Sequence, residues 1–107
     1  MQNTLVSRRL SFGINYFHGR CGHCKAMKGD YAGAAKRLAQ DKSIGKLAAV
    51  DATVEQKMTS MFNIKGFPTL KYFYKGSEYE DYEGGRRKMD FVEFIKKKIV
   101  ASQKDEL

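Results

Sequence analysis

The chain contains the stretch "LSFGINYFHGRCGHCK", residues 10–25, in which an alternating segment runs directly into a pair of cysteines. Large apolar residues alternate with small or polar ones over Leu10–Phe17, a pattern typical of a β-strand. From Gly22 to about Gln40 the chain is rich in Ala, Lys, Met and Leu, which favours a long helix. The stretch therefore predicts a strand–helix unit with Cys21 and Cys24 at its junction.

Further elements follow at regular intervals, with Gly76 available for a tight hairpin turn. We expect a buried strand at Lys46–Ala52, a helix at about Val54–Phe62, a strand at Thr69–Tyr74, its hairpin partner at Glu78–Tyr82, and a terminal helix with an apolar stripe of Met89, Val92, Ile95 and Ile99. A parallel start and an antiparallel hairpin predict an α/β fold, with a mixed central sheet flanked by helices on both faces.

The composition suits one compact domain with a net positive charge. The chain has 107 residues, 20 Lys+Arg against 12 Asp+Glu, and a formal net charge of +8. Such a charge suits acidic partners, including nucleic acid and acidic membrane surfaces. The basic residues are dispersed along amphipathic stretches, however, which indicates solvated helix faces. No run approaches about 18 apolar residues, so we expect no membrane insertion.

The last four residues form the motif "KDEL", the receptor-read address for retention in the endoplasmic reticulum. We therefore divide the chain into a single domain at 1–103 and a retention tail at 104–107, made of Lys104, Asp105, Glu106 and Leu107. The tail implies the lumen of the endoplasmic reticulum and the KDEL receptor as a partner. The first twelve residues have no apolar core of a signal peptide, so we expect an N-terminal part with the signal to be absent from this chain.

The cysteine spacing suits thiol–disulfide exchange. At the start of a helix, Cys21 meets unsatisfied amide groups and the positive end of the helix dipole, which lower a thiol pKa. Cys24 follows one turn later on the same face, near enough to close a disulfide. His23 can add positive charge that stabilises the thiolate further. A stabilised thiolate favours the reduced form and makes the pair oxidising.

Other chemistries remain open for this pair but fit less well. Zinc needs four ligands, and only His18 and His23 accompany the cysteines. Covalent haem attachment needs a histidine after the second cysteine, where Lys25 stands. A purely structural disulfide gains little chain entropy from a two-residue loop. Likewise, the peptide bond between Phe67 and Pro68 can be cis in a tight turn, or an ordinary strand start.

Five motifs in order, "CGHCK", "VDAT", "GFPTLKYF", "YEGGR" and "KDEL", resemble a catalytic thioredoxin-like domain of the protein disulfide isomerase family. The resemblance runs from about Leu10 to Leu107, and "LAAVDATV" with "FPTLKYF" is most similar to the protein disulfide isomerase-related branch of the family. It implies a thioredoxin-like fold that is shortened at the N-terminus. Since only about nine residues precede Leu10, we expect the first strand and helix of that fold to be missing or reduced.

The same resemblance implies roles for individual residues. Cys21 corresponds to the nucleophile, Cys24 to the resolving thiol, His23 to a residue that tunes their potential, and Arg86 to an arginine that lowers the pKa of the resolving thiol. Arg87 takes that role if the register shifts by one. Gly22 supports the site, together with Arg20 and Asn15 at positions that depart from the family, while Phe67, Pro68 and Thr69 bind the substrate backbone. The resemblance implies no metal, and no cofactor beyond the redox-active cysteines themselves.

Three of the positions that depart from the family pattern bear on the chemistry of the two thiols. Arg20 stands where the family usually has a tryptophan, Asn15 where many members have a buried glutamate that accepts the proton of the resolving thiol, and Ala49 where they have the lysine partner of that glutamate. Arg20 loses the flat apolar cover but can stabilise the Cys21 thiolate. Asn15 cannot accept the proton, so resolution has to rely on water or Arg86.

These features predict a luminal thiol–disulfide oxidoreductase, or protein disulfide isomerase. Its partners would be unfolded or partly folded client proteins with cysteines, and an upstream thiol oxidase or glutathione. The alternative is a redox-weak, chaperone-like module that binds clients and is retained in the endoplasmic reticulum. A nucleic-acid partner would rest on the charge alone, and the KDEL motif argues against it.

Overall fold

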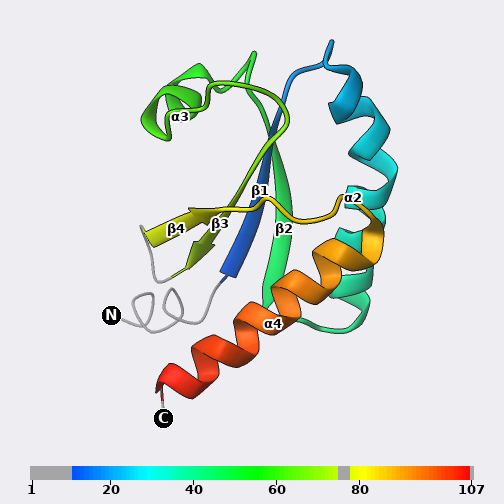
Figure 1. Ribbon diagram of the computed structural model, residues 1–107, viewed down its shortest axis with the longest axis vertical. Helices are drawn as coiled ribbons and strands as arrows, with labels where there is room; N and C mark the ends of the chain where they lie inside the picture. Colours follow the sequence, from blue (N-terminus) through cyan, green and yellow to red (C-terminus); the bar gives the residue numbers. More distant parts are fainter. Residues whose placement is uncertain (1–10, 75–77, 107) are drawn as a thin grey trace.

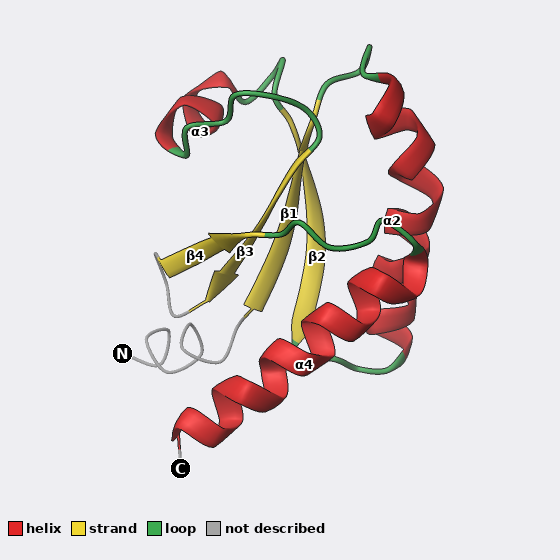
Figure 2. Cartoon of the chain, in the orientation of Figure 1, coloured by secondary structure: helices red, strands yellow, loops and turns green. Residues whose placement is uncertain are grey.

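The computed structural model describes residues 11–74 and 78–106, which alternate between strands and helices (Figure 1, Figure 2). The elements are β1 Ser11–Phe17, α2 Gly22–Gln40, β2 Gly45–Asp51, α3 Gln56–Met61, β3 Thr69–Tyr74, β4 Glu78–Asp81 and α4 Lys88–Glu106. The predicted order of strands and helices is therefore confirmed for the described residues. The expected turn at Gly76 and the start of the first strand at Leu10 lie outside them.

The strands form one mixed sheet in the order β2-β1-β3-β4. β1 pairs in parallel with β2, with Gly13 opposite Leu47, and antiparallel with β3, with Gly13 opposite Tyr72. β3 and β4 form the antiparallel pair expected of the hairpin. The parallel pair requires a crossover, which α2 provides, so the start of α2 lies at the carboxyl end of β1.

α2 and α4 pack against each other and cover one face of the sheet (Figure 1). In α2 the buried residues recur every three or four positions, which places them on one side of the helix. The core consists of Met27, Tyr31, Ala34, Leu38, Leu70, Tyr72, Phe91, Val92 and Ile95. The ring of Tyr31 meets that of Phe91 edge to face at 5.1 Å, which joins the two helices.

The opposite face carries the α3 region. Phe62, just after α3, lies 6.4 Å from the ring of Tyr16 in β1 and 5.0 Å from that of Phe73 in β3. Successive strand residues point to opposite faces, so Tyr16 and its neighbour Asn15 serve different sides of the sheet. Helical elements thus lie on both faces, as the sequence pattern predicts.

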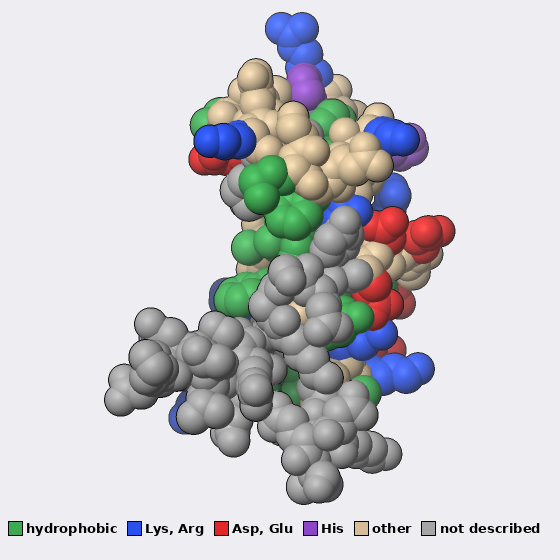
Figure 3. Space-filling view, turned by 90° about the vertical axis from the view of Figure 1, so that its left-hand side faces the viewer, with side chains coloured by type: hydrophobic (Ala, Val, Ile, Leu, Met, Phe, Trp, Pro, Cys, Tyr) green, Lys and Arg blue, Asp and Glu red, His purple; other side chains and the backbone are tan. Residues whose placement is uncertain are grey.

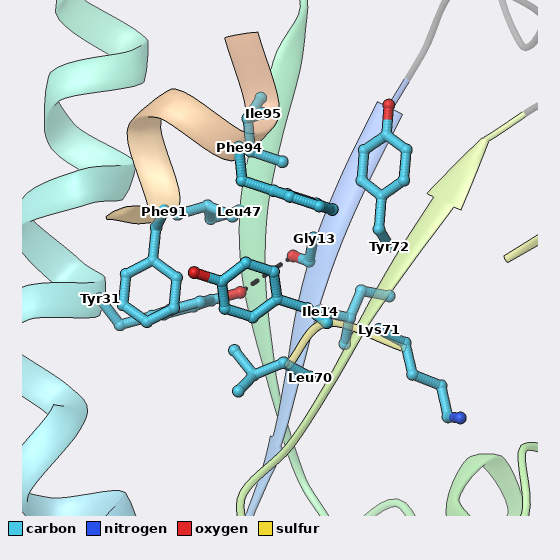
Figure 4. A pocket seen from close by; sticks show the side chains of 11 residues that line it. Gly13, Ile14, Tyr31, Leu47, Leu70, Lys71, Tyr72, Phe91, Phe94 and Ile95 are labelled. Atoms are coloured by element: carbon cyan, nitrogen blue, oxygen red, sulfur yellow. Dashed lines mark hydrogen bonds between the residues drawn. The ribbon is translucent and has the colours of Figure 1, made fainter. Parts of the chain in front are cut away.

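Tyr31 fixes α2 against the two parallel strands (Figure 4). Its buried hydroxyl oxygen lies 3.0 Å from the carbonyl oxygen of Gly13 in β1 and 2.7 Å from that of Ala48 in β2. Burial raises the pKa of the Tyr31 hydroxyl, so it remains a protonated donor at physiological pH. The contact sets the height of α2 along β1 and β2, and with it the position of the first turn of the helix.

The prediction that the second strand is buried was wrong. Lys46, Ala48 and Ala49 are exposed, because β2 lies at the edge of the described sheet and pairs with β1 alone among the described strands. Its apolar composition suggested a central strand, but burial depends on neighbours that the composition of one strand does not reveal.

Two further observations concern the surface. None of the helices that the structure describes is long and apolar enough to cross a membrane. On the face shown in Figure 3, basic side chains are scattered and a group of acidic ones lies beside them, so the described part of this face forms no continuous basic surface.

Two glycine substitutions test the packing against α4. A Cβ at Gly45 would clash with Cγ2 of Ile95 and lie 2.9 Å from Cδ1 of Ile99, so we expect Gly45→Ala to lower the free energy of unfolding by about 1–3 kcal/mol. A Cβ at Gly29, in the middle of α2, meets nothing within 4 Å. We expect Gly29→Ala to raise the free energy of unfolding by about 0.5–1 kcal/mol. Urea unfolding measures both, and a neutral Gly45→Ala would contradict the described packing.

Candidate active site

The loop between β1 and α2 turns the chain so that Cys21 directly precedes the first turn of the helix. The backbone N–H of Cys21 donates to the carbonyl of His18 at 3.0 Å, and the N–H of Arg20 donates to Nδ1 of the same histidine at 3.1 Å. Cys21 itself has an extended backbone and occupies the N-cap position of α2. The loop therefore places a thiol where a helix usually has a serine or aspartate side chain.

The Cys21 thiol acts as the cap. Its Sγ accepts a hydrogen bond from the N–H of Cys24 at 3.0 Å, and its side chain is partly exposed. The side-chain hydrogen bond from the Cys24 thiol lowers the pKa of Cys21 most; backbone N–H groups of Cys24 and His23 and the charge of Arg86 also lower it, while partial burial opposes them. Cys21 is thus the thiol that ionises more readily and can attack a disulfide.

Cys24 has the opposite character. It is only 6% exposed, and both thiols are free. Burial is the main cause that raises the pKa of Cys24; the neighbouring Cys21 adds to it, and a backbone hydrogen bond from His18 and the charge of Arg86 oppose it. The two sulfurs therefore differ in the way a nucleophile and a protected resolving thiol must differ.

The loop and the first turn of α2 also carry the polar residues His18, Arg20 and His23. Arg20 and His23 are exposed, and the ring of His18 lies 5.7 Å from that of Phe67. The contact places the segment before β3 beside the cysteine loop. In the part of the chain that the structure describes, no three His, Cys, Asp or Glu residues come together as metal ligands would.

Phe67, Pro68 and Thr69 form the entry to β3, and the bond between Phe67 and Pro68 is cis. Thr69 donates its hydroxyl to the carbonyl of Gly66 at 2.6 Å, which closes the turn. Pro68, Thr69 and Arg86 line one cavity of about 400 Å³. The structure therefore brings the predicted substrate-binding segment and the predicted arginine to the same hollow.

Asn15 lies on the other side of the pair, in a larger groove of about 440 Å³ that we call the α2–β2 groove. The groove is lined by Asn15 from β1, Cys24, Lys25 and Lys28 from α2, and Leu47 and Ala49 from β2, among others. Asn15 is 5% exposed, and its Oδ1 has no hydrogen-bond partner among the described residues. The sequence alone did not reveal this groove.

Lys28 is a groove residue that the sequence analysis missed. It is exposed and lies four residues after Cys24, hence on the same side of α2. The spacing of four residues from Cys24 could have indicated this position. However, a lysine on a helix with several basic residues cannot be told from an ordinary solvated side chain by sequence. Predicting the groove would require knowing that β2 is the edge strand of the described sheet and lies next to α2.

The thiol asymmetry predicts distinct alkylation profiles in the reduced protein. Cys21 should react with iodoacetamide at pH values where an ordinary cysteine is protonated, while Cys24 should react only at higher pH, because hydrogen bonding lowers one pKa and burial raises the other. Mass spectrometry of peptides after timed alkylation measures both. Equal profiles for the two thiols would contradict the geometry.

Arg86 and Arg87 offer a matched test of which arginine acts on the thiols. The charge of Arg86 lowers the pKa of both cysteines, so we expect Arg86→Gln to raise both and to slow alkylation at neutral pH. Arg87→Gln removes the same charge one residue away and should leave both profiles unchanged. An effect of Arg87→Gln as large as that of Arg86→Gln would overturn the assignment.

Comparisons with known proteins agree with this geometry. The family model described as Thioredoxin matches residues 3–97. Protein disulfide-isomerase of Drosophila melanogaster is 44% identical over 92 residues, 86% of this chain and 18% of that protein. Protein disulfide-isomerase A6 of Mus musculus is 48% identical over 80 residues, 74% of this chain and 18% of that protein. The chain thus spans about a fifth of these relatives.

A solved structure shows the same architecture. The first thioredoxin domain of mouse Protein disulfide-isomerase A4 matches with a TM-score of 0.75 and 26% identity, over 92% of this chain and 69% of that one. The mixed sheet and the helix that begins at the cysteine pair are therefore those of a thioredoxin fold. The chain belongs to the thioredoxin family, and its domain is similar to those of protein disulfide-isomerases.

Proposed function

We propose that this domain catalyses thiol–disulfide exchange in folding polypeptides, as a protein disulfide isomerase. The observation that carries the proposal is the Cys21 thiol at the N-cap of α2, where the Cys24 N–H binds its sulfur and its pKa is lowered. Directly behind it lies a buried second thiol with a raised pKa. The similarity to protein disulfide-isomerases supports the same activity.

Oxidation of a client begins with the Cys21–Cys24 disulfide. A client thiolate attacks Sγ of Cys21, the bond between the two cysteines breaks, and Cys24 leaves with the electron pair and takes up a proton. A second client thiolate then attacks the client sulfur of this mixed disulfide, and Cys21 leaves as its stabilised thiolate. An upstream thiol oxidase or oxidised glutathione accepts the two electrons and restores the pair.

Isomerisation and reduction start from the reduced pair. The Cys21 thiolate attacks a client disulfide and releases one client thiolate. In isomerisation, that thiolate or another one in the client attacks elsewhere and frees Cys21. In reduction, Cys24 loses its proton and attacks Cys21, which releases the client as a dithiol. Gly22, His23 and Arg20 support the nucleophile, Arg86 eases deprotonation of Cys24, and no further cofactor takes part.

The client backbone would bind along Phe67, Pro68 and Thr69. The segment adjoins the cysteine loop through the contact between Phe67 and His18, and Pro68 and Thr69 line a cavity with Arg86. Unfolded or partly folded proteins with cysteines present extended backbone that such an entry to a strand can hold. The substrate class is therefore an accessible polypeptide with cysteines rather than a small molecule.

The place of action that we propose is the lumen of the endoplasmic reticulum. The support is the terminal motif Lys104, Asp105, Glu106 and Leu107, which the KDEL receptor would read as a tail after a domain at 1–103. The backbone of α4 extends to Glu106, while Leu107 and the side chains of the other three residues lie outside the described part of the structure.

The second candidate is a client-binding module with little turnover. Two observations favour it: Asn15 places an amide rather than a carboxylate beside Cys24, and the exposed Arg20 replaces an aromatic cover. Without a proton acceptor, Cys24 would resolve mixed disulfides slowly and clients would stay attached. The two functions differ in whether the domain completes repeated cycles of thiol–disulfide exchange with its clients.

Cysteine substitutions distinguish them. In the reduction of insulin by dithiothreitol, and in the reactivation of scrambled ribonuclease, we expect the chain to accelerate the reaction, Cys21→Ala to abolish the effect, and Cys24→Ala to accumulate covalent mixed disulfides. The reason is that only Cys21 is both ionisable and accessible. A parent chain no faster than Cys21→Ala, but still bound to unfolded clients, would replace the enzyme by the binding module.

Asn15→Asp tests the missing proton acceptor. When ionised, the carboxylate can accept the proton of Cys24, so we expect faster release of clients from mixed disulfides at pH 7.5; Asn15→Ala, the control, should give no acceleration.

The same substitution should also change how stability depends on pH. Burial raises the pKa of the new carboxyl above its unfolded value of about 3.9. Its folded form therefore favours the neutral acid, and the variant should lose stability as the pH rises through the folded pKa. Client release and urea unfolding at pH 4 and 7.5 measure both effects, and unchanged release would contradict this account of Asn15.

A further inference from the structure

The α2–β2 groove is lined in part by residues of β2, and the outer edge of this strand pairs with no other strand that the structure describes. In Figure 1 β2 is the strand of the sheet nearest to α2, and the groove residues come from these two elements and from β1. The predicted client segment at Pro68 and Arg86 lines a different cavity. The groove therefore offers a second place where a polypeptide could bind.

The backbone of β2 can extend the sheet by one strand. Phe17 pairs with Asp51, and its carbonyl accepts from the N–H of Ala52 at 2.9 Å. In a parallel ladder the residues that bond to one neighbour alternate along the strand, so Leu47 and Ala49 direct their N–H and C=O groups away from β1. Among the described strands, none lies on that side. An extended peptide could satisfy these groups by strand addition.

Asn15 gives the groove a polar position. Its Oδ1 is buried and has no partner among the described residues, although most buried amide oxygens accept a hydrogen bond. The oxygen is an acceptor, so the group that completes it must be a donor. Because β2 lies between β1 and the added strand, only a side-chain donor of a bound segment that extends over β2 could reach this oxygen, and water can donate to it as well.

The positive charge of the groove favours some polypeptide ligands over others. Lys25 and Lys28 lie along it and are exposed, and no Asp or Glu is found among the described residues that line it. Its other side chains are largely apolar, including Ala32, Ala35 and Ala49. The lining therefore suits a segment that combines apolar and acidic side chains.

Two other occupants fit this charge poorly. Residues 1–10 of the chain itself contain two arginines and no acidic residue. A second copy would bring a formal net charge of +8 against another +8. Both would place like charges together at Lys25 and Lys28.

We propose that the α2–β2 groove binds an extended, acidic segment of the client polypeptide, which adds to the edge of β2 and holds the client beside Cys24 during exchange. The identity of the partner as a client rests on the proposed function, whereas the surface and its charge do not. Binding at this groove leaves the partly exposed Cys21 and the cavity at Pro68 available for the reacting cysteines. A client could thus remain associated between successive attacks.

The test uses the full reduced chain and a cysteine-free peptide of alternating valine and glutamate, as long as β2, so that binding needs no redox step. We expect the peptide to shift the backbone amide resonances of Leu47 and Ala49 and to protect both from hydrogen exchange. Lys28→Glu should weaken binding about fivefold or more. Lys36→Glu, which reverses an exposed charge of α2 outside the groove, should change it far less.

Several results would overturn the proposal: equal binding of a valine–lysine peptide, shifts confined to other elements, or equal effects of the two lysine variants. Protection of Leu47 and Ala49 in the absence of peptide would also do so, since it would mean that residues 1–10 or a second copy already cover the edge. Insulin reduction is measured in parallel. Loss of binding with intact reduction refutes the groove alone, and intact binding without reduction refutes the proposed enzyme alone.

Discussion

The hydrogen bond from the Cys24 N–H to Sγ of Cys21 is the interaction on which the site depends. It makes a thiol the cap of a helix, and it adds to the hydrogen bond from the Cys24 thiol, which lowers the pKa of Cys21 most. The bond requires α2 to begin directly after the loop from β1. Tyr31, on the same helix, holds that position through its hydroxyl contacts to Gly13 and Ala48.

The geometry separates the two sulfurs in both ionisation and access. Cys21 is partly exposed and follows a loop in which His18 contacts Phe67, whereas Cys24 is buried and lines the groove that contains Asn15. The charge of Arg86 lowers the pKa of both thiols, so it leaves the difference between their two pKa values in place. This difference suits the proposed exchange, in which Cys21 reacts first and Cys24 second.

Much of this arrangement was predictable from local patterns. Alternation in β1, helix-favouring composition in α2 and the position of the cysteines between them are encoded within a few residues, and a mixed sheet followed from their order. The expected loss of the first strand implied an exposed edge strand, but that this edge is β2 depends on which strands lie beside Ala49 rather than on its own residues. The partnerless amide oxygen of Asn15 and the groove lysine Lys28 depend on the same long-range arrangement.

We propose that the hydrogen bonds to Sγ of Cys21 stabilise its thiolate and make the pair oxidising. Equilibration of the chain in glutathione buffers, followed by quantification of the Cys21–Cys24 disulfide, measures its reduction potential directly. We expect a value near the about −180 mV of protein disulfide isomerase, well above the about −270 mV of thioredoxin. A potential at or below that of thioredoxin, or a pair that never closes, would contradict it.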